Sequence, residues 1–271
     1  MLGIFRLVLL MTSAMLFFGC DIQYKLLYLP GSPAPSEGSL KARGLKAWPG
    51  AGNYRGYIGI DEAKHATGTV VVFHGNAGTA ADRTYHMKAL SSLGYRVILA
   101  EYPLYGGRAG VLGERAFVKD GVETVRLAFE QFGGPVFLLG ESLGCGVAAG
   151  VSRQTSVKID GIILITPWDT LKAVARAKFP YLPVGLFLKD RYDTIDNLKT
   201  FKGRIAVVGA ERDELIPIGH AVHLYDSIAG SGKKMWTIKG AGHNDWPMYI
   251  NGTWWKETMD FVSDGGTKRQ L

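Results

Sequence analysis

The chain has 271 residues, a length that fits one large α/β domain and is short for two domains with separate cores. Its residues are 47% hydrophobic and 20% charged, a globular balance that excludes a chain left unfolded for want of apolar surface. The net charge is +7, but Lys and Arg are scattered and form no basic run with interleaved aromatic residues, so we expect no nucleic-acid partner.

A short apolar run opens the chain. It follows a single arginine, covers residues 7–18 apart from one Thr-Ser pair, and ends at Gly19 and Cys20. A membrane-spanning helix needs roughly 20 apolar residues, whereas a signal peptide has a shorter apolar core. The pattern therefore predicts that residues 1–20 are a signal peptide or a lipoprotein-type anchor and that the protein is exported.

The end of this run resembles a bacterial lipoprotein cleavage site, in which a cysteine becomes the lipidated first residue. Residues 17–20 read Phe-Phe-Gly-Cys, so two phenylalanines stand where a Leu-like residue and then a small residue are usual. We expect lipid attachment at Cys20 and a protein anchored to a membrane of the bacterial cell envelope. The alternative is an uncleaved amphiphilic anchor that ends in Gly-Cys by chance. Cys145 is the other cysteine, and we interpret it as a small core residue.

A linker is predicted over residues 21–38, because residues 30–38 are rich in Pro, Gly and Ser and cannot hold a helix. The folded body is expected to cover residues 39–271. It contains no internal repeat of fixed period, which argues against a solenoid or a propeller.

Five near-continuous apolar runs in the body are typical of strands buried on both faces of a parallel sheet. They cover residues 69–73, 96–100, 136–139, 161–165 and 204–208, and a more exposed strand is expected at residues 234–238. Segments of helical periodicity lie at residues 80–93, 114–132, 143–153, 218–228 and 248–262. The alternation predicts an α/β fold, with a mostly parallel central sheet and helices on both faces. Ligands of such sheets bind beyond the carboxyl ends of the strands.

The third of these strands runs into the sequence Gly-Glu-Ser-Leu-Gly at residues 140–144, a G-x-S-x-G motif. Glycines on both sides of the serine allow a tight strand-to-helix turn that projects its hydroxyl above the sheet. The motif alone is weak evidence, but its position between a buried strand and a helix is the context that a nucleophile requires. We therefore interpret Ser142 as the nucleophile.

Serine needs a base to take its proton, and in this arrangement the acid and then the histidine follow the serine in the chain. Three histidines qualify. His220 and His223 fall within a helical stretch, whereas His243 lies in a glycine-rich turn after the last predicted strand. Catalytic residues concentrate on loops held by a rigid scaffold, so His243 is the predicted general base.

The acid is expected in the loop at residues 209–217, after the fifth strand. From there Asp213 can hold the imidazole in the tautomer that accepts the serine proton and can stabilise the imidazolium that results. Glu211 and Glu214 in the same loop are rivals. Asp245 is a weaker one, because residues so close in sequence to the histidine rarely face it across a site.

The oxyanion of a tetrahedral intermediate needs fixed hydrogen-bond donors. One is expected to be the backbone N–H of Leu143, directly after the nucleophile. The other is the N–H of Asn76, in the loop after the first buried strand, with Ala77 as its alternative. His74, at the start of this loop, precedes the serine in the chain, so we interpret it as a buried brace rather than as the base.

Six stretches of the chain together resemble one branch of the α/β-hydrolase superfamily. They are residues 26–30, 74–78, 101–107, 140–144, 209–217 and 242–244. The branch comprises membrane-associated serine hydrolases, among them protein depalmitoylases and related esterases of bacteria and eukaryotes. Relatives often have Asp at the position of Glu101 and a second Gly at that of Leu104, so the neighbouring turn is expected to differ in shape.

The resemblance also implies a small cap between the strand at residues 161–165 and the acid loop. Residues 167–196 are similar to that cap, and their apolar centre lies at residues 179–188. Such a centre could lie over the serine and favour an acyl chain, or it could be a buried packing element.

These observations predict a serine hydrolase that cleaves an ester or thioester of a small-molecule or acylated substrate through an acyl-enzyme, with no metal and no organic cofactor. One alternative is a peptidase similar to the proline-iminopeptidase branch, in which Asp169, Asp190 and Asp193 would recognise a free amine. A second alternative is a non-catalytic binding protein on the same fold.

Overall fold

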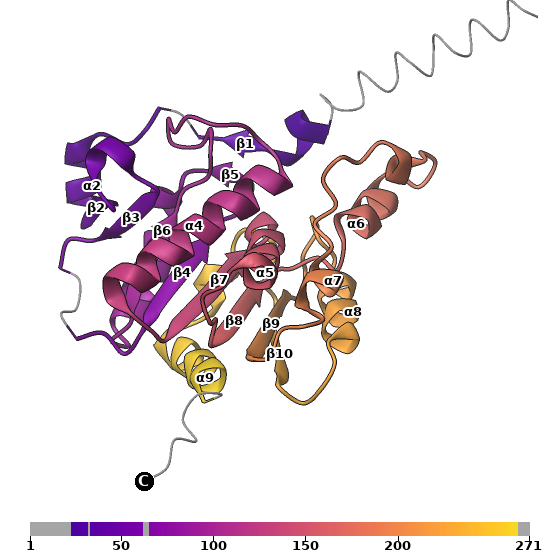
Figure 1. The fold of residues 1–271 in the computed structure, drawn as a ribbon. Helices are drawn as coiled ribbons and strands as arrows, with labels where there is room; N and C mark the ends of the chain where they lie inside the picture. The colour runs from indigo at the N-terminus through magenta and orange to yellow at the C-terminus, as the bar shows by residue number, and fades with distance from the viewer. Residues whose placement is uncertain (1–22, 32, 62–64, 265–271) are drawn as a thin grey trace, which may run out of the picture.

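An eight-stranded sheet forms the centre of the molecule (Figure 1). The structure, a computed structural model, describes residues 23–264 except residue 32 and residues 62–64. The strand order is β10-β9-β8-β7-β4-β6-β3-β2, and all neighbouring pairs are parallel except the two that involve β3. The strands are β2 (Leu45–Trp48), β3 (Gly56–Gly59), β4 (Thr69–Phe73), β6 (Arg96–Ala100), β7 (Val136–Glu141), β8 (Gly161–Ile165), β9 (Arg204–Ala210) and β10 (Lys233–Ile238). The predicted fold class is confirmed.

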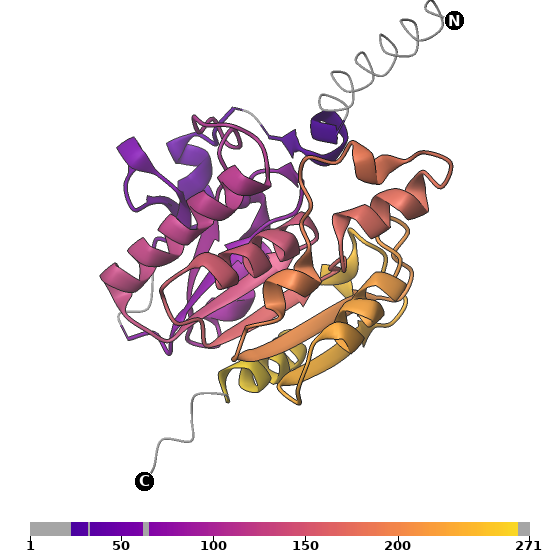
Figure 2. The same cartoon turned by 45° about the vertical axis from the view of Figure 1, so that its right-hand side comes forward.

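Helices cover both faces of this sheet (Figures 1 and 2). They are α2 (Glu37–Ala42), α3 (Thr84–Ser91), α4 (Glu114–Phe132), α5 (Leu143–Gln154), α6 (Leu171–Lys178), α7 (Thr194–Leu198), α8 (Gly219–Ser227) and α9 (Gly252–Ser263), with short 3-10 turns η1 (Ala51–Asn53), η2 (Ala80–Arg83), η3 (Val184–Leu186) and η4 (Trp246–Tyr249). Side chains alternate along each strand, so Val71 and Phe73 of β4 pack with α4 and α5, whereas Val70 and Val72 pack with α3 and α9. Burial on both faces explains why the central strands are apolar throughout.

The strands β2 and β3 form an antiparallel edge that the sequence pattern did not predict. Both are short, and β3 begins and ends with glycine, a residue that weakens a strand and usually marks a turn. Here glycine is required, because a Cβ atom at Gly56 would lie 2.1 Å from the carbonyl oxygen of Leu99 in β6. Glycine at the start of β3 therefore made the strand hard to predict, and the same glycine allows β3 to approach β6 closely.

The predicted linker over residues 21–38 was wrong for most of its described length. Residues 23–27 are helical, Tyr28 is only 3% exposed, and β1 (Leu29–Pro30) pairs in parallel with β5 (Ala77–Gly78). The helix α2 then begins at Glu37. Proline and glycine content predicted an irregular backbone, but it carried no information about the aromatic packing of residues 23–30 against the body.

The predicted cap residues, 167–196, leave the sheet after β8 and contain α6, η3 and the start of α7. An antiparallel bridge between Thr170 and Asp193 closes the base of this segment. The expected signal peptide and Cys20 lie outside the described residues. Within residues 23–264, no described helix combines the length and the apolar character needed to cross a bilayer.

Candidate active site

A strained turn carries Ser142 from β7 into α5. Its backbone has φ 54° and ψ −117°, in the positive-φ region that is rare for residues other than glycine. A Cβ atom at Gly144 would lie 1.9 Å from the carbonyl oxygen of Phe73, and one at Gly140 would lie 2.6 Å from the Cα of Cys145. The two glycines of the motif are thus required by close approach of the backbone, which leaves the serine at the carboxyl end of the central strand.

The structure brings the three predicted triad residues together. Nε2 of His243 lies 2.9 Å from Oγ of Ser142, and Nδ1 of His243 lies 2.7 Å from Oδ2 of Asp213. The second carboxylate oxygen of Asp213 accepts the backbone N–H groups of Leu215 (2.9 Å) and Ile216 (2.7 Å). All three triad residues are less than 9% exposed. With Nδ1–H donated to the carboxylate, Nε2 is free to accept the serine proton.

Two of the rival acids bind other partners, and the third is exposed. Glu211 pairs with Lys239 at the surface, and Asp245 accepts the N–H of Gly242, so it braces the turn that holds His243. The structure places Glu214 on the exposed side of the acid loop.

The two histidines of α8 bind a different acid, Asp169. Its carboxylate accepts from Nδ1 of His220 (2.9 Å) and of His223 (2.7 Å). Burial alone would raise the pKa of Asp169, but the hydrogen bonds from His223, from the N–H of Thr170 and from His220 lower it. Across the described residues, no group of three or more His, Cys, Asp or Glu side chains has an arrangement that could hold a metal ion.

The loop after β4 lies against the nucleophile turn, since a Cβ atom at Gly75 would be 3.7 Å from the Cβ of Ser142. As the first residue of α5, Leu143 has no acceptor for its N–H within the helix. None of the hydrogen bonds between described residues uses the N–H of Asn76. Both predicted donors are therefore available, and the geometry leaves Ala77 as the alternative.

Residues outside the loop fix the orientation of the peptide bond between Asn76 and Ala77. The carbonyl oxygen of Asn76 accepts the hydroxyl of Tyr105 (2.7 Å) and the N–H of Leu29 (2.9 Å). The same N–H of Leu29 also lies 3.1 Å from the hydroxyl oxygen of Tyr105. The residues that hold this loop come from two distant parts of the chain, which is why sequence motifs alone did not reveal them.

His74 braces the same loop, as predicted from its place in the chain. It is 1% exposed, its Nδ1 lies 2.7 Å from the carbonyl oxygen of Gly75, and its Nε2 lies 3.0 Å from Glu101. The other oxygen of Glu101 accepts the N–H of Ala80. Leu104 has φ 66°, so the turn keeps a backbone that favours glycine although leucine occupies the position.

Next to the nucleophile, Glu141 forms a partly buried polar cluster that sequence reasoning missed. Its carboxylate accepts the hydroxyl of Tyr85, lies 3.1 Å from Nε2 of His86 and is 3.3 Å from the guanidinium of Arg83. Burial alone would raise the pKa of Glu141, but the hydrogen bond from His86 and the charge of Arg83 lower it to about 2. A carboxylate that folding withdraws from water requires hydrogen-bond donors or cations as partners. The glutamate inside the G-x-S-x-G motif was therefore the signal in the sequence for this cluster.

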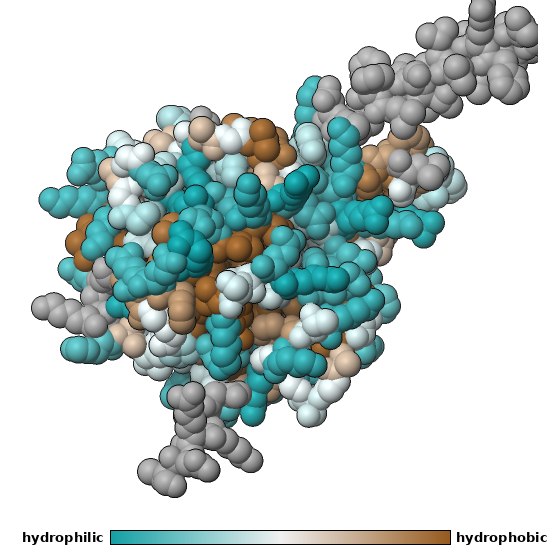
Figure 3. All heavy atoms as spheres, in the orientation of Figure 1, coloured by the Kyte–Doolittle hydropathy of each residue, from teal (hydrophilic) through white to brown (hydrophobic). Residues whose placement is uncertain are grey.

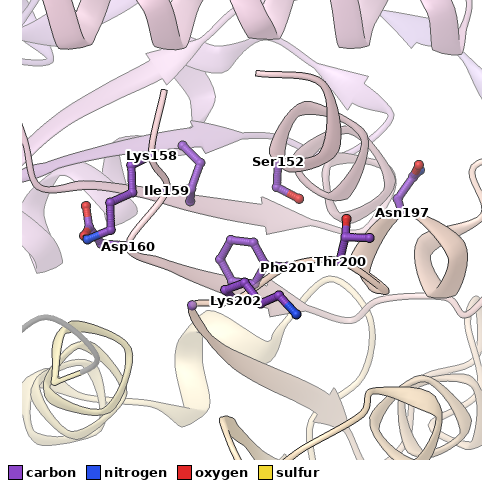
Figure 4. Close-up of a pocket in the computed structure, with 9 residues that line it drawn as sticks. Ser152, Lys158, Ile159, Asp160, Asn197, Thr200, Phe201 and Lys202 are labelled. Atoms are coloured by element: carbon purple, nitrogen blue, oxygen red, sulfur yellow. The ribbon is translucent and has the colours of Figure 1, made fainter. Parts of the chain in front are cut away.

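A cavity of about 210 Å³ lies at the opposite edge of the sheet (Figure 4). It is lined by residues that precede β8 and β9 or lie near the end of α5: Ser152, Lys158, Ile159, Asp160, Asn197, Thr200, Phe201, Lys202 and Gly203. Because these strands are parallel to β7, their amino ends face away from Ser142. This cavity is not part of the triad site.

Comparison with known proteins identifies relatives of this arrangement. A family model described as serine aminopeptidase, S33, matches residues 64–189. An uncharacterised protein of Mycobacterium tuberculosis is 28% identical over 262 residues, which cover 93% of this chain and 90% of that protein. The lysophosphatidylserine lipase ABHD12 of Danio rerio is 29% identical over 181 residues. That match covers 60% of this chain and 47% of the lipase, so the chain spans about half the length of this relative.

Solved structures show the same fold. An esterase of Pyrococcus furiosus superposes with a TM-score of 0.66 at 15% identity, covering 88% of this chain and 97% of that one. A monoacylglycerol lipase of Paleococcus ferrophilus gives a TM-score of 0.54 at 18% identity, covering 75% of this chain and 98% of that one. At these identities the likeness concerns the arrangement of sheet and helices.

The partly buried charge of Glu141 leads to a pH-dependent prediction for stability. Because its pKa falls from the ordinary 4.5 to about 2 on folding, the ionised carboxylate stabilises the fold above pH 4.5, and this contribution is lost as the pH falls through 2. Glu141→Gln should lower the free energy of unfolding at pH 7 by roughly 1–3 kcal/mol. In urea titrations the difference from wild type should shrink between pH 5 and pH 2.5. An equal difference at both ends of that range would contradict the assignment.

Proposed function

We propose that the chain is a hydrolase of the α/β-hydrolase superfamily and that it cleaves ester or thioester bonds of acyl substrates through Ser142. The observation that carries the proposal is the unbroken hydrogen-bonded path from Asp213 through His243 to Ser142. The same path speaks against a non-catalytic binding protein, because binding alone requires no hydroxyl paired with an oriented imidazole.

In the proposed reaction, Oγ of Ser142 attacks the substrate carbonyl while Nε2 of His243 takes its proton. The imidazolium that forms is stabilised by Asp213, which its two backbone hydrogen bonds hold in place. The oxyanion would be bound by the N–H groups of Leu143 and Asn76, each such donor being worth about 3 kcal/mol in the transition state. His243 then protonates the leaving group, and water, deprotonated by the same imidazole, hydrolyses the acyl-enzyme.

The proposed substrate class is an acyl ester or thioester that is met at a membrane. Support comes from the relative named as a lysophosphatidylserine lipase, from the esterase and lipase folds, and from the apolar residues of the cap. The proposal includes the bacterial envelope location, the anchor at residues 1–20 and lipid on Cys20. These parts rest on the sequence of the N-terminus.

A peptidase of the proline-iminopeptidase type is the second candidate, since the matching family model is described as a serine aminopeptidase. That reaction would need free carboxylates in the cap to bind an amine. Asp169 is occupied by two histidines, Asp190 accepts from Tyr28 and from the N–H of Glu114, and Asp193 caps α7. All three cap acids proposed for amine recognition already have partners, which favours the esterase.

A substrate panel separates the two candidates. We expect measurable kcat/KM on p-nitrophenyl esters of graded acyl length and none above background on aminoacyl p-nitroanilides, because the cap acids are engaged. The panel is read in parallel at one protein concentration, with Ser142→Ala as the blank. Cleavage of anilides alone would overturn the choice of ester hydrolysis.

The nucleophile assignment is tested by covalent labelling. Wild-type protein should react with a fluorophosphonate probe, and Ser142→Ala should lose both labelling and activity, with kcat lower by a factor on the order of 10³–10⁶. Ser152→Ala is the matched control: it lies on the same helix, its hydroxyl donates to the carbonyl of Ala149, and its labelling should be unchanged. Retained labelling of folded Ser142→Ala at another residue would reject the assignment.

The hydrogen bonds on the carbonyl of Asn76 predict a role for Tyr105 in positioning the oxyanion loop. Tyr105→Phe removes one of them and should lower kcat about 3- to 30-fold with little change in KM, because the loop donors act on the transition state. Tyr95→Phe is the control, a buried tyrosine that packs on Phe137 near the amino end of β7. Equal kcat values for the two variants would argue against this role.

A further inference from the structure

The outer part of the cap has an unusual charge pattern. Residues 171–189, which we call the cap tip, contain four basic residues and no Asp or Glu. The basic residues are Lys172, Arg176, Lys178 and Lys189. The nearest acids along the chain, Asp169 and Asp190, are buried and paired as described above, so they do not neutralise the tip.

Large apolar side chains on the cap tip face outward. Phe179 is 42% exposed, Leu182 is 59% exposed and Tyr181 is 96% exposed. They follow α6 directly, and Figure 3 shows apolar residues gathered at this end of the molecule beside hydrophilic ones. Of the two interpretations left open for residues 179–188, the buried packing element does not hold for these three side chains. Their exposure costs free energy unless a partner covers them.

The cations of α6 are available for a partner as well. Lys172, Arg176 and Lys178 are exposed and make no ion pair with any described residue. The stem of Lys172 lies against η3, since a Cβ atom at Gly185 would be 2.8 Å from its Cε. The tip therefore presents fixed positive charge next to aromatic and aliphatic side chains.

The start of the described chain lies beside this surface. The side-chain oxygen of Gln23 accepts the N–H of Lys189 at 2.8 Å, and Figure 2 shows the N-terminal helical turn next to the segment that contains α6. The apolar run at residues 7–18 ends only a few residues earlier in the sequence. The described chain therefore begins next to the cap tip.

We propose that the cap tip binds an anionic lipid bilayer, with Phe179, Tyr181 and Leu182 at the boundary between headgroups and acyl chains and the α6 cations against anionic headgroups. Aromatic and leucine side chains next to Lys and Arg are typical of surfaces that lie in this boundary. A tyrosine suits it because its ring is apolar and its hydroxyl is polar. The contact is additional to the N-terminal anchor and does not depend on the proposed hydrolysis.

The test measures backbone hydrogen exchange of the full chain on vesicles. Peptides from residues 171–189 are followed on phosphatidylcholine vesicles with and without 30 mol% phosphatidylglycerol, a composition set for the experiment. The N-terminal segment is present in every sample, so the comparison isolates the headgroup charge. We expect the tip to exchange at least about fivefold more slowly on the anionic vesicles, since each cation near such a surface contributes roughly that factor in binding.

Two variants identify the side chains responsible. Replacing Lys172, Arg176 and Lys178 together by Gln should abolish the protection, whereas replacing Lys41, Lys88 and Lys119 by Gln, an equal change of charge elsewhere, should preserve it. A second variant, Tyr181→Ser with Leu182→Ser, should reduce protection while keeping the dependence on phosphatidylglycerol.

Three results would overturn the proposal. One is equal exchange of the tip on neutral and anionic vesicles. Another is equal loss of protection in the cap-tip and control lysine variants. The third is protection without vesicles that grows with protein concentration, which would assign the tip to contacts between copies of the chain.

Discussion

The site depends on one imidazole that must contact two side chains from distant parts of the chain. His243 lies 30 residues after Asp213 and 101 residues after Ser142, and it hydrogen-bonds both. A parallel sheet makes this possible, because β7 and β9 end at the same edge and deliver the serine turn and the acid loop side by side across β8. The turn after β10 then brings the histidine over both, and Asp245 keeps that turn closed.

The site also requires close packing of the backbone around the turn that carries Ser142. At Gly144 the helix α5 approaches β4 so closely that no side chain fits, and at Gly140 the chain passes against its own next turn. The partly buried Glu141, next to the serine, adds charge-assisted contacts to His86 of α3 and Arg83 of η2, which also stabilise the strained turn.

The sequence revealed those parts of the molecule whose cause is local. Strands such as β4 and β8 could be predicted because continuous runs of β-branched and aliphatic residues are typical of strands buried on both faces. Ser142 could be predicted because its motif stands between a strand and a helix. The strand β3 could not be predicted, because the need for glycine at Gly56 comes from its contact with β6, which exists only in the folded sheet. The partners of Glu141 and of the Asn76 carbonyl were likewise hidden, because Tyr85, Tyr105 and Leu29 become neighbours only through the fold.

The N-terminal stretch that replaces the expected spacer has a consequence for where the chain could be shortened. Burial raises the pKa of Tyr28, so its hydroxyl stays protonated and donates to Asp190 at the base of the cap, while Leu29 holds the loop beside the serine. A form of the protein that begins at Gln23 would keep these hydrogen bonds. A form that begins after Pro30 would lose them, so residues 23–30 belong to the folded body rather than to a spacer.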